Sequence, residues 1–254
     1  MTIIAFNRYW VIRWPWMLVN VLVFALLLGL SYWQWLRAEE KMNTLARIEH
    51  WKNQGALNSN QLSSINHLER DGLQLDFQGR WLSPGVWLID NKMVNGRIGY
   101  DVLIAVQDIS APADAAALLV NLGWIAAPQQ RDTLPEVRVP NELHIRGIFR
   151  TRIKGVLLGT NIENKGVWPM RIQQVDSESL AAYLSRPLVD GLIYQEKNSP
   201  FLVHYQSVVL PPERHRAYAL QWFLLAVAVV VVAIAAGARK NPQPYNNHKE
   251  QSND

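Results

Sequence analysis

The stretch HRAYALQWFLLAVAVVVVAIAAGA, residues 215–238, decides the architecture of this chain of 254 residues. From residue 217 onward it carries no charge, and its Ala, Val and Leu content is typical of a helix surrounded by lipid. A bilayer core requires roughly 20 apolar residues in helical form. The segment 217–238 meets this requirement by itself, so we predict a transmembrane helix there.

A second apolar segment, MLVNVLVFALLLGL at residues 17–30, lies near the other end of the chain. It is short, but aromatic residues extend it on both sides, as in the belts at the two faces of a membrane. These aromatics are Trp10, Trp14, Trp16, Tyr32, Trp33 and Trp35. We therefore predict a transmembrane helix over residues 14–36. The alternative is a signal peptide cleaved near residues 29–31, although bulky aromatics follow that small-residue site directly.

Two spans place both termini on one side of the membrane. The short tails are basic, with Arg8, Arg13, Arg239 and Lys240. Basic tails favour a cytoplasmic location, although the opposite flanks are basic as well. We predict cytoplasmic tails at residues 1–13 and 239–254, the second one disordered, and an extracytoplasmic domain at residues 37–216.

The intervening domain changes its hydrophobic period from helical to alternating. LQLDFQG at residues 73–79 alternates apolar and polar residues, which predicts a half-buried strand. The runs 86–93 and 97–106 flank Asn95-Gly96, a pair that favours a tight hairpin turn. Further predicted elements are strands at 117–125, 142–149, 188–196 and 202–210, a short helix within 58–69 and a helix starting near Asp176. The expected fold is α+β, with a mostly antiparallel β domain and a few helices between two membrane helices.

Composition and motifs exclude several kinds of function. The chain has no cysteine, so disulfides, thiolate metal sites and cysteine nucleophiles are absent. A net charge of +4 without a long Lys/Arg run does not indicate a nucleic-acid partner. Zinc-protease, nucleophile-elbow, P-loop and Rossmann motifs do not occur. His144 and His204 fall in strand patterns, where structural histidines with satisfied partners are expected.

His215 differs from the other histidines because it opens the second span. On a helix, Tyr218 and Trp222 share its face, so the imidazole is expected above an aromatic stripe. Such a setting suits haem, whose iron commonly takes an imidazole as axial ligand. The alternative is an interfacial anchor of His, Tyr and Trp that binds no cofactor.

The end of the first span is expected to complete the same site. Arg216 is suited to pair with haem propionates. The residues that leave the membrane on the same side are Trp33, Gln34 and Arg37. Gln34 and Gln221 are predicted to hydrogen-bond between the helices. The alternative is an aromatic belt in which Arg37 extends its charge into water.

Six segments, in order along the chain, resemble the surfeit locus protein 1 family, the Shy-type cytochrome oxidase assembly factors. They are WQWLRAEEK at 33–41, FQGRW at 77–81, GYDV at 99–102, VNLGWI at 120–125, WPMR at 168–171 and the segment that begins at His215. The sequence departs from the family pattern at Leu122, where Arg is usual, and at Ala126, where Pro is usual. The Asn often found before the final His is missing around Glu213.

The resemblance implies an assembly factor, not an enzyme, that aids delivery or insertion of haem a into the large subunit of a haem–copper oxidase, chiefly cytochrome c oxidase. It implies His215 as the ligand of the haem iron. Its expected surroundings are Tyr218, Trp222, Trp33, Arg37 and Arg216.

The implied partners are the oxidase large subunit, other assembly factors and the lipid bilayer. The implied location is the inner (cytoplasmic) membrane, with two spans and the main domain facing the periplasm. Two alternatives stay open. One is a membrane scaffold for oxidase assembly that binds no haem, and the other is a membrane-anchored hydrolase whose site is assembled from distant loops.

Overall fold

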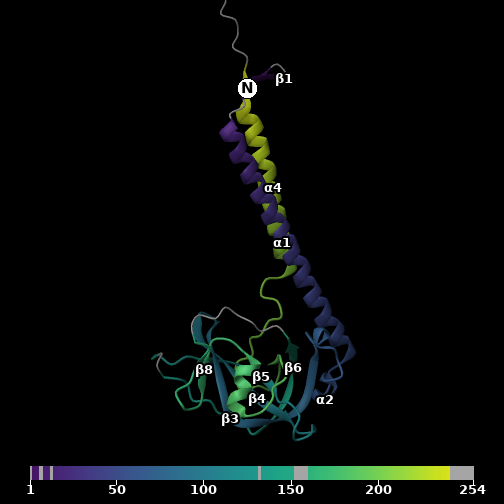
Figure 1. The fold of residues 1–254 in the computed structure, drawn as a ribbon, viewed down its shortest axis with the longest axis vertical. Helices are drawn as coiled ribbons and strands as arrows, with labels where there is room; N and C mark the ends of the chain where they lie inside the picture. Colours follow the sequence, from purple (N-terminus) through teal and green to yellow (C-terminus); the bar gives the residue numbers. More distant parts are fainter. Residues whose placement is uncertain (1, 6–7, 12–13, 131–132, 152–159, 241–254) are drawn as a thin grey trace, which may run out of the picture. The chain divides into compact units, whose positions relative to one another are not determined.

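The computed structural model describes residues 2–5, 8–11, 14–130, 133–151 and 160–240. The chain divides into two compact units (Figure 1). One comprises Met1–Met42 and Val209–Asp254 and contains the apolar helices, and the other is Asn43–Val208 and contains the sheet.

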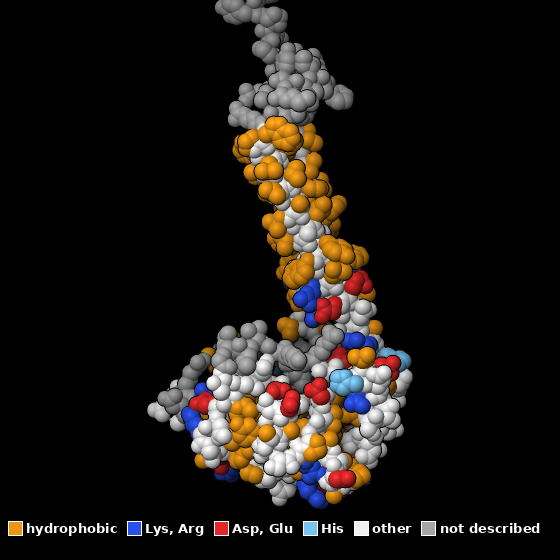
Figure 2. Space-filling model, viewed as in Figure 1, with side chains coloured by type: hydrophobic (Ala, Val, Ile, Leu, Met, Phe, Trp, Pro, Cys, Tyr) orange, Lys and Arg blue, Asp and Glu red, His pale blue; other side chains and the backbone are white. Residues whose placement is uncertain are grey.

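The two long helices are α1, Trp14–Gln54, and α4, Pro212–Gly237. Both are long and apolar enough to cross a membrane. Figure 2 shows apolar side chains, in orange, exposed along both helices, as lipid contact requires. α1 continues without a break into the polar sequence after residue 36.

α1 and α4 pack along a seam whose positions alternate in spacing between three and four residues. Partly or fully buried positions on α1 include Asn20, Phe24, Leu27, Ser31, Gln34 and Ala38. Those on α4 include Pro212, His215, Ala219, Trp222, Ala226 and Val229. A mean spacing of 3.5 residues keeps a helix face turned toward its partner, as in a coiled coil.

Three short strands also belong to the helical unit. β1 (Thr2–Ala5) and β10 (Ala238–Lys240) both pair antiparallel with β2 (Arg8–Val11). Of the predicted disordered tail, residues 239–240 therefore lie in β10, and residues 241–254 lie outside the described residues.

The domain consists of one mixed sheet with short helices. Its strands are β3 (Gln74–Val94), β4 (Arg97–Asp108), β5 (Leu118–Ala126), β6 (Glu142–Arg150), β7 (Ile162–Glu163), β8 (Met170–Ile172) and β9 (Leu192–Gln195). The helices are α2 (Ser59–Leu62), a 3-10 turn at His67–Glu69 and α3 (Ser177–Leu184).

Strand pairing closes the sheet into a ring. The order β4-β5-β9-β6-β3 returns to its start because β3 also pairs with β4. The β3–β8 and β5–β9 pairs are parallel and the other pairs are antiparallel, which confirms a mostly antiparallel α+β domain. Successive residues of β4 and of β5 enter two different cores. Val102 and Val120 join one, and Leu103 and Leu119 join the other together with Leu180 of α3.

Most local predictions in the domain are confirmed. Asn95 and Gly96 have φ of 49° and 74°, the positive values that a two-residue hairpin turn requires. Asp176 occupies the N-cap of α3. The predicted strand 202–210 is wrong, because only Leu202 forms a bridge, to Trp124, and the rest of the segment is irregular. Side-chain contacts hold this segment in place of strand pairing, including the bond from Arg150 to Tyr205.

Candidate functional site

His215 lies in the first turn of α4, on the seam that faces α1. Pro212 begins the helix, a position where proline costs nothing because the first N–H groups have no helical partner. The His215 side chain is buried, with 9% of its surface exposed. Its Nδ1 lies 2.7 Å from Oε1 of Gln34.

This contact determines which ring nitrogen of His215 carries the proton. A carboxamide oxygen only accepts, so with Oε1 facing the ring the tautomer protonated on Nδ1 satisfies this contact. Nε2 then has a free lone pair, and no described residue forms a hydrogen bond with it. Metal-binding histidines commonly show this arrangement, in which one ring nitrogen donates to an oxygen and the other binds the metal.

Small and polar residues surround the His215–Gln34 contact. Ser31, one turn away on α1, donates from Oγ to the backbone oxygen of Ala219 at 2.8 Å. Ala38 is fully buried and Ala219 nearly so. Small side chains allow two helix backbones to approach closely, which brings Gln34 within reach of the ring.

Two arginines near this end of the seam already have carboxylate partners. Arg216 lies 3.5 Å from Glu39 and its guanidinium stacks over Trp35 at 5.9 Å. Arg37 pairs with Glu40 at 2.7 Å and lies 5.8 Å from the ring of Trp33. All four charged side chains are about half exposed, so each pair contributes little stability and another anion can replace the carboxylate at small cost.

The structure brings some of the predicted site residues together. His215 meets Gln34, and Trp222 lies on the same seam, partly buried. Tyr218 lies off the seam and is 41% exposed. The predicted Gln34–Gln221 pair is wrong, because Gln221 is exposed and Gln34 bonds to His215 instead.

The remaining predicted residues interact within the helix pair in other ways. Arg37 contacts both Trp33 and Glu40 along α1, whereas Arg216 reaches across from α4 to α1. Ser31 was missed as an interhelical residue. The spacing of Ser31, Gln34 and Ala38 along one face of α1 was the available signal.

The donor set fits haem in its chemistry. It offers one imidazole nitrogen with a free lone pair, exposed aromatic rings and two replaceable arginine partners. A planar macrocycle cannot reach a ring that is 9% exposed without movement of the neighbouring side chains. Within the described part of the chain, no group of three His, Cys, Asp or Glu residues forms a conventional metal site.

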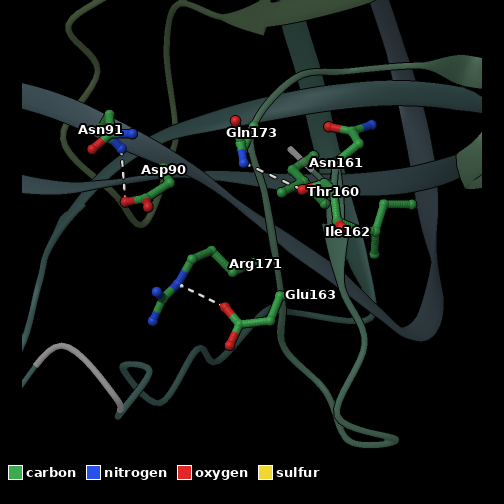
Figure 3. Close-up of a pocket in the computed structure, with 9 residues that line it drawn as sticks. Asp90, Asn91, Thr160, Asn161, Ile162, Glu163, Arg171 and Gln173 are labelled. Atoms are coloured by element: carbon green, nitrogen blue, oxygen red, sulfur yellow. Dashed lines mark hydrogen bonds and ion pairs between the residues drawn. The ribbon is translucent and has the colours of Figure 1, made fainter. Parts of the chain in front are cut away.

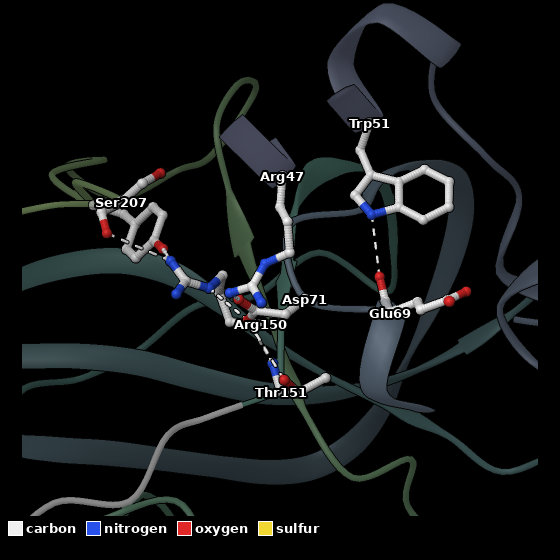
Figure 4. Close-up of polar contacts among 8 residues, drawn as sticks. Arg47, Trp51, Glu69, Asp71, Arg150, Thr151 and Ser207 are labelled. Carbon is white, nitrogen blue, oxygen red and sulfur yellow. Dashed lines mark hydrogen bonds and ion pairs between the residues drawn. The ribbon is translucent and has the colours of Figure 1, made fainter. Parts of the chain in front are cut away.

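A buried carboxylate, Asp71, organises a second polar cluster inside the domain (Figure 4). It accepts hydrogen bonds from Nε of Arg150 at 2.8 Å and from the backbone N of Thr151 at 3.1 Å. Arg47, from the end of α1, reaches it at 3.3 Å. Arg150 also donates to the hydroxyl of Tyr205 at 2.6 Å, so the cluster holds the irregular segment after β9.

The cluster in Figure 4 includes a second contact from the end of α1. Nε1 of Trp51 donates to the backbone oxygen of Glu69 at 3.1 Å. Because Trp51 and Glu69 belong to the same compact unit, this bond fixes the last turn of α1 to the domain.

Two of the family-like motifs meet around Asp101, which is buried. Asp101 lies 2.5 Å from Nε2 of His204 and accepts from Asn121 at 3.0 Å. Asn121 in turn accepts from the backbone N of Gly123, whose φ is 117°. GYDV and VNLGWI therefore build the domain core. His144 similarly bonds to Asp76 at 2.6 Å, so both histidines have the partners predicted for structural histidines.

An open cleft of about 530 Å³ is lined by residues of β3, β7 and β8 and of the segments next to them (Figure 3). It is lined by Asp90, Asn91, Thr160, Asn161, Ile162, Glu163, Arg171, Ile172 and Gln173. Glu163 pairs with Arg171 at 3.5 Å, and the hydrogen bond from Lys165 lowers the pKa of the Glu163 carboxyl. A lining rich in charges and carboxamides does not suit an apolar macrocycle.

The shifted pKa of Tyr194, in β9, also does not indicate catalysis. Burial, followed by the neighbouring Tyr205 and Asp101, raises the pKa of Tyr194. Tyr194 and Tyr205 stack with ring centroids 3.8 Å apart. A tyrosine whose pKa rises stays protonated at neutral pH, so it is unsuited to act as a base.

Residues 21–227 of the chain match the SURF1 family, over the greater part of both apolar helices and all of the domain. The chain belongs to the SURF1 family. This family is known as one of cytochrome oxidase assembly factors and is not a known enzyme family. No curated protein matches the sequence significantly. With two helices able to span a bilayer, this SURF1 member has the character of a membrane protein.

Leu122, where the sequence departs from the family pattern, lies in the core of the domain. Leu122 is fully buried in the cluster that contains Val102 and Val120. A leucine satisfies this position by packing, whereas an arginine there would need a partner for its charge.

Proposed function

We propose that this SURF1 protein binds haem a and passes it to the large catalytic subunit of a cytochrome c oxidase during assembly. Membership of the SURF1 family supports the assembly role and the involvement of oxidase partners. The basic tails support a location in the inner membrane with the domain on the periplasmic side.

The hydrogen bond between Nδ1 of His215 and Gln34 carries the haem part of this proposal. It leaves Nε2 as an acceptor at the boundary between an apolar helix pair and water. Haem a, once bound, supplies the iron that the oxidase needs, and this chain performs no reaction on it. Binding through one histidine, with Arg37 and Arg216 exchanging their carboxylates for propionates, gives an attachment weak enough to be reversed.

The test compares membranes from cells that lack the chain with membranes in which the wild type, His215→Ala or His50→Ala is restored. His50 is an exposed histidine on α1 that bonds to Gln54, four residues on, and serves as the matched control. We expect the reduced-minus-oxidised a-type signal to return with the wild type and His50→Ala. Full recovery with His215→Ala, at equal expression, would refute the haem-ligand role.

The low exposure of His215 favours a second candidate, a scaffold that binds oxidase subunits without haem. In that case His215→Ala restores oxidase assembly and still co-purifies oxidase subunits. Haem content of the purified chain separates the two functions, because a scaffold contains none.

A further inference from the structure

We propose that Gln34 is a positioning residue that fixes the tautomer of His215 and aims Nε2 at its ligand. The inference rests on the haem-binding function proposed above and names a residue that acts through the histidine. Its basis is a hydrogen bond between residues 181 positions apart, formed across the seam of the two apolar helices.

The geometry restricts the imidazole in two ways. The 2.7 Å contact to Oε1 holds the ring plane, and burial against α1 limits rotation to other partners. One turn away, the 2.8 Å bond from Ser31 to the backbone oxygen of Ala219 fixes the position of the two helices along their axes. Gln34 and His215 therefore cannot slide out of register while both helices remain paired.

The chemistry follows from the acceptor character of the carboxamide oxygen. A neutral imidazole carries one proton, and only its other nitrogen can bind a metal. With Oε1 as partner, the proton stays on Nδ1 and Nε2 remains a ligand. Without Gln34, the buried Nδ1–H loses its acceptor, so the ring is expected to reorient and the proton to redistribute between the nitrogens.

Three variants separate this role from general packing. Gln34→Met has a similar length but removes the strong acceptor, and Gln34→Glu keeps an acceptor and cannot donate. Gln221→Met makes the same exchange at an exposed glutamine of α4 and is the matched control. If the Gln34 amide group donated to Nδ1 instead, Gln34→Glu would reverse the tautomer.

The first measurement is ¹⁵N NMR of the histidine rings in the full chain in lipid nanodiscs, without haem. Subtraction of the His215→Ala spectrum assigns the His215 signals among the six histidines. We expect a protonated Nδ1 and an unprotonated Nε2 in the wild type, Gln34→Glu and Gln221→Met. Gln34→Met should give a mixture of tautomers. A wild-type tautomer protonated at Nε2, or a Gln34→Met spectrum identical to the wild type, would overturn the inference.

The second measurement is titration of the same proteins with hemin, followed by the Soret band. Loss of a partner that orients a metal ligand typically weakens affinity by roughly 10–100-fold. We expect this loss for Gln34→Met and wild-type affinity for Gln221→Met. Unchanged affinity in Gln34→Met, with loss in His215→Ala, overturns only the positioning role. Unchanged affinity in His215→Ala overturns the role of His215 as the haem ligand, and with it the positioning role of Gln34.

Discussion

Replacement of Asp71 by Asn should destabilise the domain strongly, because it leaves a cation without its counter-charge. The Asp71 and Arg150 side chains are 8% and 16% exposed, so water screens their 2.8 Å contact poorly. Removal of one partner from a buried ion pair costs about 3–5 kcal/mol. Arg150 keeps its bond to Tyr205, and the Asn oxygen can still accept, so we expect the lower end of this range.

A loss of about 3 kcal/mol corresponds to a fall in Tm of roughly 6–12 °C for a domain of this size. The assay is thermal unfolding of the full chain in detergent at one scan rate, followed by near-ultraviolet circular dichroism. Arg47→Gln is the matched control, since Arg47 contacts the same carboxylate but is 51% exposed. Its cost should stay below about 1 kcal/mol and vanish at high salt.

A Tm of Asp71→Asn within about 2 °C of the wild-type Tm would contradict the buried pair, because a loss of only 1 kcal/mol already lowers Tm by about 2–4 °C. An equal fall in Tm for Arg47→Gln and Asp71→Asn would contradict it as well. Either result would mean that water reaches the Asp71–Arg150 pair and screens it. A salt-insensitive loss confined to Asp71→Asn supports the buried pair.

Four further substitutions test packing at named positions. Gly147→Ala places a Cβ against the backbone oxygen of Tyr194 in the adjacent strand β9. We expect a loss of stability of about 3 kcal/mol or more in the same unfolding assay. A neutral result would contradict this prediction. At Gly96 a Cβ would meet open space, but the φ of 74° is unfavourable for alanine, so Gly96→Ala should cost only about 1 kcal/mol of stability. Equal losses from both glycine variants would refute this distinction. Ala219→Leu should separate the helices beside the histidine and abolish its bond to the glutamine in the NMR spectrum, whereas Ala226→Leu, two turns farther along α4, should leave that signal unchanged.

Local patterns predicted much of this fold. The lengths of the apolar segments predicted both long helices, and the Asn95-Gly96 pair predicted the hairpin between β3 and β4. The segment 202–210, LVHYQSVVL, resembles a strand in sequence because it is rich in Val and Tyr, which favour strands. Backbone pairing there is limited to the Leu202 bridge, a property that periodicity does not report.

The candidate site was predicted in its location but not in its contacts. The start of a span at a histidine and the exit of another span near Gln34 are visible in sequence. Which of Trp33, Gln34 and Arg37 meets the histidine depends on the rotation of α1 about its axis. The seam of buried positions sets that rotation, and it selects Gln34.

By itself, the sequence determined that two apolar helices precede and follow a β-rich domain along the chain, because hydrophobic length and period are local properties. Only the tertiary structure decided the partners of the buried polar groups. Asp71 meets Arg150, and Asp101 meets His204, across separations of 79 and 103 residues. The register of the closed sheet brings these groups together, and the need to neutralise each buried charge then keeps them paired.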